Sequence, residues 1–472
     1  MSALERSEVR GSAEMLNAAL LLKVEQARPH SLLVRFDQRE KLPDHGAVFD
    51  RLTLQCAGRR ATLGRCRYES GAAIPELTEP APSSSDGRLV FLEQVYDFTQ
   101  LIAHGRIIEL SQRVRQLPLV WARKSEIQAQ FCDLTSQLLY DFQVYRGLFD
   151  GLDRSLADEP PEVRTSVHEA AIAAEYENFS AFFGTQLQHL ESAVQHFTRQ
   201  DHERHGFYFR KQLCDLIHAS EFLARTNLKP RGYSGDSVMM RMIYERQFRG
   251  RSLFSKFMHR HPLDTIAAEA VRHRRQLVAS TVRAAQERCA RRDARTRVLS
   301  VACGPAWELR DLIKTPRDLE QLELVLLDQD PLALDDARDT VMELEQRFRT
   351  RLDARLVKDS VRTMIGATDL TSRWGQFDVV YAMGLFDYLT PPVARAVLGR
   401  LYELLAPGGV VTVGNFHARN PTRVYMEYWM DWVIYYRDEA EFLELASELP
   451  FAEVTLTYEA TGSQMFLQVR KP

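Results

Sequence analysis

The stretch Arg297-Val-Leu-Ser-Val-Ala-Cys-Gly-Pro-Ala-Trp-Glu308 has the pattern of a strand, a tight turn and the start of a helix. Val298 to Val301 is a short apolar run, as in buried parallel strands. Cys303 to Ala306 is a turn of small residues, and Glu308 opens a helical pattern. Small side chains let a ligand approach the backbone, and a helix N-terminus offers free N–H groups. The stretch therefore predicts a cradle for a nucleotide-like ligand.

Two common nucleotide-binding motifs are absent from this turn. It is not Gly-x-Gly-x-x-Gly, so a dinucleotide fold is not indicated, and it lacks the Gly-Lys-Ser/Thr of an NTP-binding P-loop. Taken alone, the turn fits a plain connection between a strand and a helix equally well. The rest of the chain decides between the two interpretations.

After this turn the chain alternates between strands and helices. Apolar runs predict strands at 298–301, 322–327, 352–357, 377–383 and 410–413. Helical patterns beginning at Pro331 and Pro391 separate the later strands. This alternation is typical of a Rossmann-like, doubly wound parallel sheet, whose ligands lie beyond the carboxyl ends of its strands.

Polar side chains follow the predicted strands at these ends. Asp328 and Asp330 come about twenty residues after the turn, where an acid can accept hydrogen bonds from both ribose hydroxyls. Asp359 follows the third strand and could accept from an adenine amino group. The expected ligand-binding residues at the strand ends are Ala302, Cys303, Gly304, Pro305, Glu308, Asp328, Gln329, Asp330, Asp359, Ser360, Met383, Gly384 and Leu385.

A second signal lies upstream, in Lys229-Pro-Arg-Gly-Tyr-Ser-Gly-Asp236. One proline and two glycines favour a shaped loop, and Asp236 or Ser237 can cap the helix that follows. Arg231, Tyr233 and Asp236 offer a cation, a phenol and a carboxylate, so the loop could close over a zwitterionic ligand. The alternative is a capped linker between domains.

Length and composition indicate the class of protein and the number of domains. A chain of 472 residues, 45% hydrophobic and 26% charged, predicts a soluble protein of several domains. With 61 basic against 64 acidic residues, its net charge of −3 gives no indication of nucleic-acid binding. We expect a β-rich domain at 14–110, a helical region at 111–225 and the ligand-binding domain at 226–472.

Several features point to a cytoplasmic protein. There is no apolar run long enough for a transmembrane segment, and residues 1–12 are too polar for a signal peptide. The six cysteines lack zinc-ligand spacing, so we expect reduced thiols, with Cys303 a small buried side chain rather than a nucleophile. We expect no metal site, because the clustered histidines share no ligand face; they are His168, His189, His196, His202 and His205.

The two regions before residue 226 have different patterns. We expect residues 1–13 to be mobile, and short strands at 20–24, 31–36, 48–54, 61–68 and 88–92 to form a small barrel or sandwich. Apolar residues at helical spacing then predict two long helices, broken at Asp158-Glu-Pro-Pro161. Their seam could serve a homodimer or dock on the domain that follows.

The order of motifs after residue 226 resembles a class I S-adenosylmethionine-dependent methyltransferase (EC 2.1.1.-). The usual first-strand motif is Leu-Asp-Val-Gly-Cys-Gly-x-Gly; Ser300, Ala302 and Ala306 here replace its Asp and two of its glycines. Phe377-Asp-Val-Val-Tyr381 and Leu404-Leu-Ala-Pro-Gly-Gly409 are also typical. The resemblance implies S-adenosylmethionine as cofactor, with Tyr233 and Asp236 as substitutes for the missing acid at 300.

A narrower resemblance involves Pro230-Arg-Gly-Tyr-x-Gly-Asp236, Ala302-Cys-Gly-Pro-Ala-x-Glu308 and Met426-Glu-Tyr-Trp-Met-Asp-Trp432. These segments are similar to bacterial 3-hydroxypalmitic acid methyl ester biosynthesis proteins. The resemblance implies methyl transfer to the carboxylate of a hydroxylated long-chain fatty acid, giving a diffusible quorum-sensing signal. It also implies a PilZ-like N-terminal domain, here degenerate: Arg35 and Arg39 have the spacing of a cyclic di-GMP motif, but lie within a strand pattern, and the partner motif is absent.

The acceptor site of such an enzyme needs an apolar lining and a means of orienting the acceptor. A carboxylate acceptor needs no base, whereas a hydroxyl does, and His417 and then Asp387 are the candidates. The expected substrate-binding residues are Arg231, Tyr388, Asn415, Phe416, Trp429, Trp432 and Tyr436. The alternatives are an O-methyltransferase for the hydroxyl of a secondary metabolite, and a cyclic di-GMP effector that uses the fold as a scaffold.

Overall fold

The computed structural model describes residues 9–15, 18–28, 31–37, 42–56, 59–63, 65–70, 86–91, 107, 110–111, 114–115, 117–367, 369–450 and 452–472. The chain divides into two compact units, Met1–Glu126 and Ile127–Pro472, and each is described by itself.

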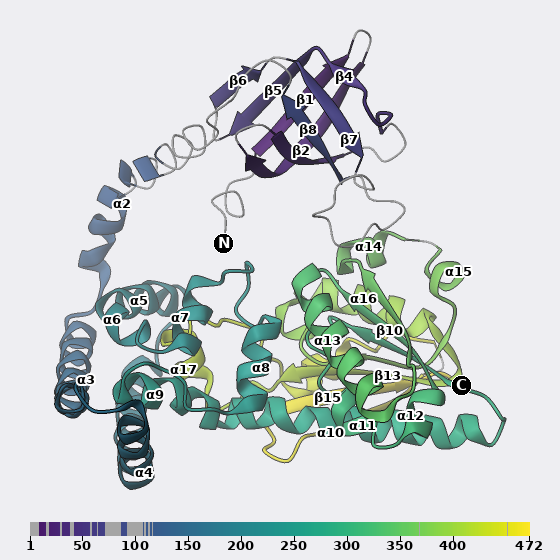
Figure 1. Ribbon diagram of the computed structural model, residues 1–472. Coiled ribbons are helices and arrows are strands. Elements are labelled where there is room, and N and C mark those ends of the chain that lie inside the picture. Colours follow the sequence, from purple (N-terminus) through teal and green to yellow (C-terminus); the bar gives the residue numbers. More distant parts are fainter. Residues whose placement is uncertain are drawn as a thin grey trace. The chain divides into compact units, whose positions relative to one another are not determined.

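The described strands of the first unit form an eight-stranded antiparallel sheet (Figure 1), in the order β4-β7-β8-β3-β2-β1-β5-β6. β4 also contacts β1, so the sheet curls around a core that includes Leu22, Val34 and Phe49. The elements of this unit are β1 (Val9–Met15), β2 (Ala18–Arg28), β3 (Ser31–Phe36), β4 (Val48–Phe49), β5 (Arg51–Cys56), β6 (Arg59–Leu63), β7 (Cys66–Ser70), β8 (Asp86–Phe91), α2 (Leu117–Ala122) and η4 (Arg123–Glu126).

One expectation about this unit was wrong. Residues 9–13 are not a mobile tail but part of β1, which pairs with both β2 and β5. A polar segment can form an inner strand because the backbone makes the ladder, while Ala13 is buried and Arg10 is exposed. Arg35 lies 3.3 Å from Glu25 on the surface. Arg39 lies outside the described residues, and the PilZ-like assignment stays a prediction.

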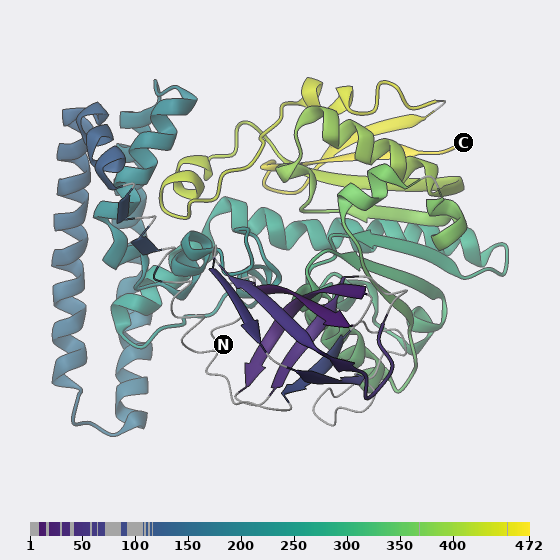
Figure 2. The ribbon, with the colours of Figure 1, turned by 90° about the horizontal axis from the view of Figure 1, so that it is seen from above.

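The second unit begins with the predicted helical hairpin. α3 (Ala129–Ser155) and α4 (Pro161–Val194) lie side by side (Figure 2). The break falls where the sequence predicted it, and Pro161, the last residue of the predicted break, is the first residue of α4. Their apolar seam packs on the rest of the same unit: the ring of Phe142 lies 5.2 Å from that of Trp429. The helices that follow are α5 (Arg199–Gln212), α6 (Cys214–Ile217), α7 (Glu221–Leu228), α8 (Ser237–Glu245), α9 (Leu253–Arg260), η5 (His261–Asp264) and α10 (Ile266–Ala290).

A seven-stranded sheet forms the rest of the second unit, in the order β11-β10-β9-β12-β13-β15-β14. Its five predicted strands are present and parallel: β9 (Thr296–Val301), β10 (Leu322–Asp328), β11 (Asp353–Lys358), β12 (Phe377–Ala382) and β13 (Leu405–Phe416). The sheet is nevertheless mixed, because β14 (Glu453–Tyr458) and β15 (Gln464–Arg470) form an antiparallel hairpin beside β13. The purely parallel sheet predicted from the sequence was wrong at this edge.

Helices cover both faces of this sheet (Figure 1). Alternate residues of β9 point to opposite sides, so Val298 packs with α10, α11 and α13 while Leu299 packs with α14 to α16 and α18. These helices are α11 (Leu309–Leu312), α12 (Pro316–Glu320), α13 (Pro331–Phe348), α14 (Val361–Gly366), α15 (Leu370–Trp374), η6 (Phe386–Tyr388), α16 (Pro391–Glu403), α17 (Arg423–Tyr428) and α18 (Glu439–Glu444). None of the described helices is long and apolar enough to cross a membrane.

Candidate active site

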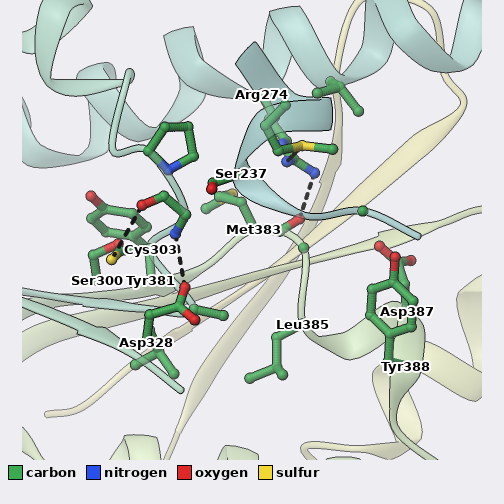
Figure 3. A pocket seen from close by; sticks show the side chains of 18 of the residues that line it. Ser237, Arg274, Ser300, Cys303, Asp328, Tyr381, Met383, Leu385, Asp387 and Tyr388 are labelled. Atoms are coloured by element: carbon green, nitrogen blue, oxygen red, sulfur yellow. Dashed lines mark hydrogen bonds between the residues drawn. The ribbon is translucent and has the colours of Figure 1, made fainter. Parts of the chain in front are cut away.

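A cavity of about 280 Å³ lies at the carboxyl ends of β9, β10 and β12. Figure 3 shows Cys303 and Asp328 toward one end, Asp387 and Tyr388 toward the other, and Arg274 with Met383 between them. Predicted residues that line it are Tyr233, Ala302, Cys303, Gly304, Pro305, Glu308, Asp328, Gln329, Asp359, Ser360, Met383, Gly384, Leu385, Asp387, Tyr388, Phe416 and Trp432. The topology thus brings together residues from the ends of five strands, β9 to β13, and from an upstream loop.

The turn after β9 has left-handed backbone at three alternate positions. Ala302, Gly304 and Ala306 have φ angles of 52°, 54° and 52°. Glycine adopts this conformation without strain, whereas each alanine costs about 1–2 kcal/mol. A Cβ atom on Gly304 would meet no atom within 4 Å, so the space above the turn is open to a ligand. The replacement of two motif glycines by alanine therefore leaves the cradle accessible.

Asp328 lies opposite this turn at the end of β10. Its Oδ2 accepts from the N–H of Gly304 at 3.0 Å, and its Oδ1 accepts from the N–H of Asp330 at 3.0 Å. Burial raises the pKa of this carboxyl, and the two backbone N–H groups oppose the shift. Each carboxylate oxygen keeps a second lone pair, so the group is placed to accept from a pair of ligand hydroxyls.

Gly304→Ala is expected to weaken cofactor binding about tenfold, because the new methyl group enters the open space over the turn. The left-handed φ also costs about 1–2 kcal/mol of stability. Gly462→Ala is the matched control: it has a φ of 72° and no atom within 4 Å of its Cβ site, but lies in the β14–β15 turn. It should lose similar stability in thermal unfolding and keep its affinity in calorimetry; equal loss of affinity in both variants would contradict the assignment.

The loop at 229–236 is held down differently from the way the sequence predicted. Asp236 is fully buried, accepts from Arg225 Nε with both oxygens, and caps α8 through the N–H of Met239. Arg231 donates to Asp330 Oδ2 at 3.1 Å, as does the hydroxyl of Tyr233 at 3.3 Å. Asp236, Arg231 and Asp330 therefore fasten the loop and do not line the cavity, while the ring of Tyr233 does.

The opposite end of the cavity is mostly apolar. Leu385, Phe416, Trp432 and Ile434 line it, and the indole N–H of Trp432 donates to the hydroxyl of Tyr388 at 2.8 Å. Gly235 lies against this pair, since a Cβ there would come within 2.8 Å of both side chains. The loop at 229–236 thus closes on the aromatic end of the cavity.

Asp387 is the ionisable group at this apolar end. It is 3% exposed, and its Oδ1 accepts from the N–H of Phe416 at 2.7 Å. Burial raises the pKa of this carboxyl to about 6. The group can therefore change its charge near neutral pH.

Four other predicted residues lie outside the cavity lining. His417 accepts from the N–H of Arg419 at Nδ1 and lies 3.2 Å from Glu439. Asn415 donates to the carbonyl oxygens of Phe416 and Tyr435. Trp429 and Tyr436 pack in the core shared with the helical hairpin. Their contacts hold the 415–437 segment in place, and none of the four lines the cavity.

Sequence reasoning missed the contribution of α10. Val271, Arg274, Arg275 and Val278 line the cavity at helical spacing, so one face of this helix covers the site. Arg274 is only 8% exposed and donates to the carbonyl oxygen of Met383 at 3.1 Å. The sequence signal for this contribution was Arg274 itself, an arginine on the apolar face of an amphipathic helix. Other missed lining residues are Gly235, Ser237, Met240, Tyr244, Ser300, Val361, Tyr381 and Ile434.

Comparison with known proteins gives the class of the domain. Residues 299–411 match the family model of a methyltransferase domain. No curated protein sequence matches the chain. The central part of the second unit is therefore a methyltransferase domain, as the sequence predicted, and the predicted cofactor is S-adenosylmethionine.

Several solved structures are similar to part of this chain. A possible exported protein of Bordetella parapertussis is 18% identical, with a TM-score of 0.41, over 56% of this chain and 88% of that chain. The magnesium protoporphyrin IX methyltransferase of Synechocystis PCC 6803, with bound SAM, is 13% identical, with a TM-score of 0.31, over 44% of this chain and 84% of that chain. The N-methyltransferase NodS of Bradyrhizobium japonicum WM9, in complex with S-adenosyl-l-homocysteine, is 16% identical, with a TM-score of 0.30, over 44% of this chain and 89% of that chain.

Proposed function

We propose that this protein transfers the methyl group of S-adenosylmethionine to the carboxylate of a long-chain, hydroxylated fatty acid, giving a methyl ester. One observation carries the proposal. A single cavity joins the turn at 302–305 and Asp328 to an apolar end lined by Leu385, Phe416 and Trp432. A polar, nucleotide-sized end and an apolar end are what a cofactor and a lipid-like acceptor require.

The residues at the polar end fit the cofactor. Gly304 leaves the space over the turn open, and the second lone pairs of Asp328 suit the two ribose hydroxyls. Asp359 and Ser360, after β11, line the same end, where the adenine would lie. When bound, S-adenosylmethionine supplies a methyl group on a positively charged sulfur.

At the other end, the chain aligns the acceptor. The side chains of Leu385, Phe416, Trp432 and Ile434 exclude water and hold an acyl chain. Most of the rate enhancement then comes from holding the acceptor oxygen in line with the methyl group. Below about pH 6 the Asp387 carboxyl is protonated and can donate a hydrogen bond to an acceptor carboxylate.

The position of Asp387 also favours a second candidate, an O-methyltransferase for a hydroxyl acceptor. A buried carboxyl with a pKa of about 6 is suited to remove a hydroxyl proton near neutral pH. In that reaction Asp387 takes the proton from the acceptor oxygen as the oxygen–methyl bond forms.

The two candidates predict opposite pH dependence. With a carboxylate acceptor, Asp387 gains a repelling charge as pH rises through about 6, so the KM for the acceptor should rise. With a hydroxyl acceptor the base is active only above about pH 6, so kcat should rise there instead. Asp387→Asn should abolish either dependence. It should slow a hydroxyl reaction about 100-fold or more, but leave carboxylate methylation within about tenfold.

Product analysis tests the proposal directly. The full chain is incubated with methyl-labelled S-adenosylmethionine and a panel of hydroxylated long-chain fatty acids, and the products are identified by mass spectrometry. We expect labelled methyl esters that mild alkali hydrolyses. Label confined to alkali-stable ethers, or to short or aromatic acceptors, would contradict the fatty acid assignment.

A further inference from the structure

The cavity contains a buried cation without an anionic partner. Arg274 donates to the carbonyl oxygen of Met383 at 3.1 Å and to Met240 Sδ at 3.3 Å, and it lies against the hydroxyl of Tyr244. None of these groups carries a charge. No carboxylate of the described residues is paired with Arg274 within 4.0 Å, and those of Glu308 and Asp387 act on it only over longer distances. Its neighbour Arg275 differs, since it is paired with Asp311 at 2.7 Å. A guanidinium buried to this extent is costly unless an anion joins it.

The same cavity contains a buried carboxylate without a cationic partner. Glu308 is 9% exposed and accepts from the hydroxyl of Tyr381 at 2.8 Å. Among the described residues no lysine, arginine or histidine is paired with it within 4.0 Å, and Arg274 and Arg275 act on it only over longer distances. Glu308 and Arg274 come from different elements, the N-terminus of α11 and the middle of α10, and both line the site.

Three other groups near the cavity that could bind an amino acid are already engaged. The carbonyl oxygen of Met383 accepts from both Arg274 and Gln464 Nε2, which uses both of its lone pairs. The carboxylate of Asp236 binds Arg225, and the hydroxyl of Tyr233 donates to Asp330. The binding through Tyr233 and Asp236 that the sequence predicted therefore has no free charge and no free donor to offer.

We propose that Arg274 binds the carboxylate, and Glu308 the ammonium, of the methionine end of the cofactor. This assignment rests on the proposed function, because it takes S-adenosylmethionine as the ligand. It places one charge of the zwitterion opposite each unpaired charge of the cavity. It also explains how the chain holds the amino acid end with Ser300 in place of the usual acid.

Ligands that lack these charges test the assignment by binding alone. S-adenosylhomocysteine carries both charges, its decarboxylated analogue carries only the ammonium, and 5′-methylthioadenosine carries neither. In calorimetry of the full chain, Arg274→Met should weaken the binding of S-adenosylhomocysteine about 10- to 100-fold. It should weaken the binding of 5′-methylthioadenosine by no more than about twofold. The variant should also no longer discriminate between S-adenosylhomocysteine and its decarboxylated analogue.

Glu308→Gln should also lower the affinity for S-adenosylhomocysteine, but keep the preference for it over the decarboxylated analogue. Arg283→Met, an exposed change on the same helix, is the matched control and should leave all affinities unchanged. Unchanged binding of 5′-methylthioadenosine shows that a variant is folded. The wild-type chain alone gives the preference for the carboxylate, from its affinities for S-adenosylhomocysteine and the decarboxylated analogue.

Two results would overturn the assignment. One is an equal loss of affinity for S-adenosylhomocysteine and 5′-methylthioadenosine in Arg274→Met or Glu308→Gln. The other is unchanged S-adenosylhomocysteine binding in Arg274→Met with a raised KM for the acceptor. That result would show that the guanidinium binds the acceptor instead of the cofactor. Failure of the proposed function is distinguishable. If the cofactor is wrong, the wild-type chain binds none of the three ligands, and if only the acceptor is wrong, all three ligands bind as predicted.

Discussion

Asp328→Ala is expected to weaken S-adenosylmethionine binding about 100-fold or more. The carboxylate is oriented by the N–H groups of Gly304 and Asp330, so it needs no rearrangement to accept from two ribose hydroxyls. Each charge-assisted hydrogen bond contributes about 1.5–3 kcal/mol. Removing both also leaves the Gly304 N–H without its acceptor. Isothermal titration of the full chain with the cofactor measures the change.

Two variants make this prediction specific. Asp328→Asn keeps one acceptor oxygen, so its affinity for S-adenosylmethionine should lie between those of the wild type and Asp328→Ala. Asp335→Ala removes an exposed carboxylate of α13 that pairs with Arg338, and should bind as the wild type does. Unaltered binding in Asp328→Ala would show that this carboxylate does not hold the ribose.

The residues at the cofactor end of the cavity could be predicted from the sequence for a physical reason. Parallel strands bring their carboxyl ends to one edge, so a small-residue turn and an acid after the next strand must lie close together. The prediction of Asp328 needed only the strand pattern. Asp330, two residues later, was indistinguishable in the sequence, but in the fold it caps α13 through Leu332 and binds Arg231.

Asp236→Ala should lower the free energy of unfolding by about 3–5 kcal/mol, the largest stability effect we expect. Asp236 is fully buried, its partner Arg225 is largely so, and removal of one member of such a pair leaves an uncompensated charge. The same substitution removes the cap of α8. Chemical denaturation monitored by circular dichroism gives the difference.

Asp438→Ala is the matched control for this effect. Asp438 also caps a helix, α18, through a capping box, but it has no such ion pair and is exposed. Its loss should cost about 1 kcal/mol. Similar losses in both variants would show that the bond between Asp236 and Arg225 adds nothing beyond the cap.

The acceptor end was harder to predict, because its residues come together only through tertiary packing. Trp429 and Trp432 belong to one aromatic run, but Trp429 packs on the ring of Phe142 while Trp432 faces the cavity. The sequence analysis named His417 first and Asp387 second as the candidate base. The fold puts only Asp387 in the lining, whereas His417, the residue after β13, accepts from the backbone N–H of Arg419. The prediction of Arg274 would have required knowing which face of α10 turns toward the cavity, and the helical pattern alone did not assign that face.

The central claim is that the second unit binds S-adenosylmethionine, and calorimetric titration of the full chain tests it most directly. One series uses S-adenosylmethionine and the other uses cyclic di-GMP. We predict one cofactor site per chain, with a dissociation constant in the micromolar range that Asp328→Ala raises about 100-fold or more. Binding of cyclic di-GMP without any binding of S-adenosylmethionine would contradict the account, and would make the methyltransferase domain a scaffold.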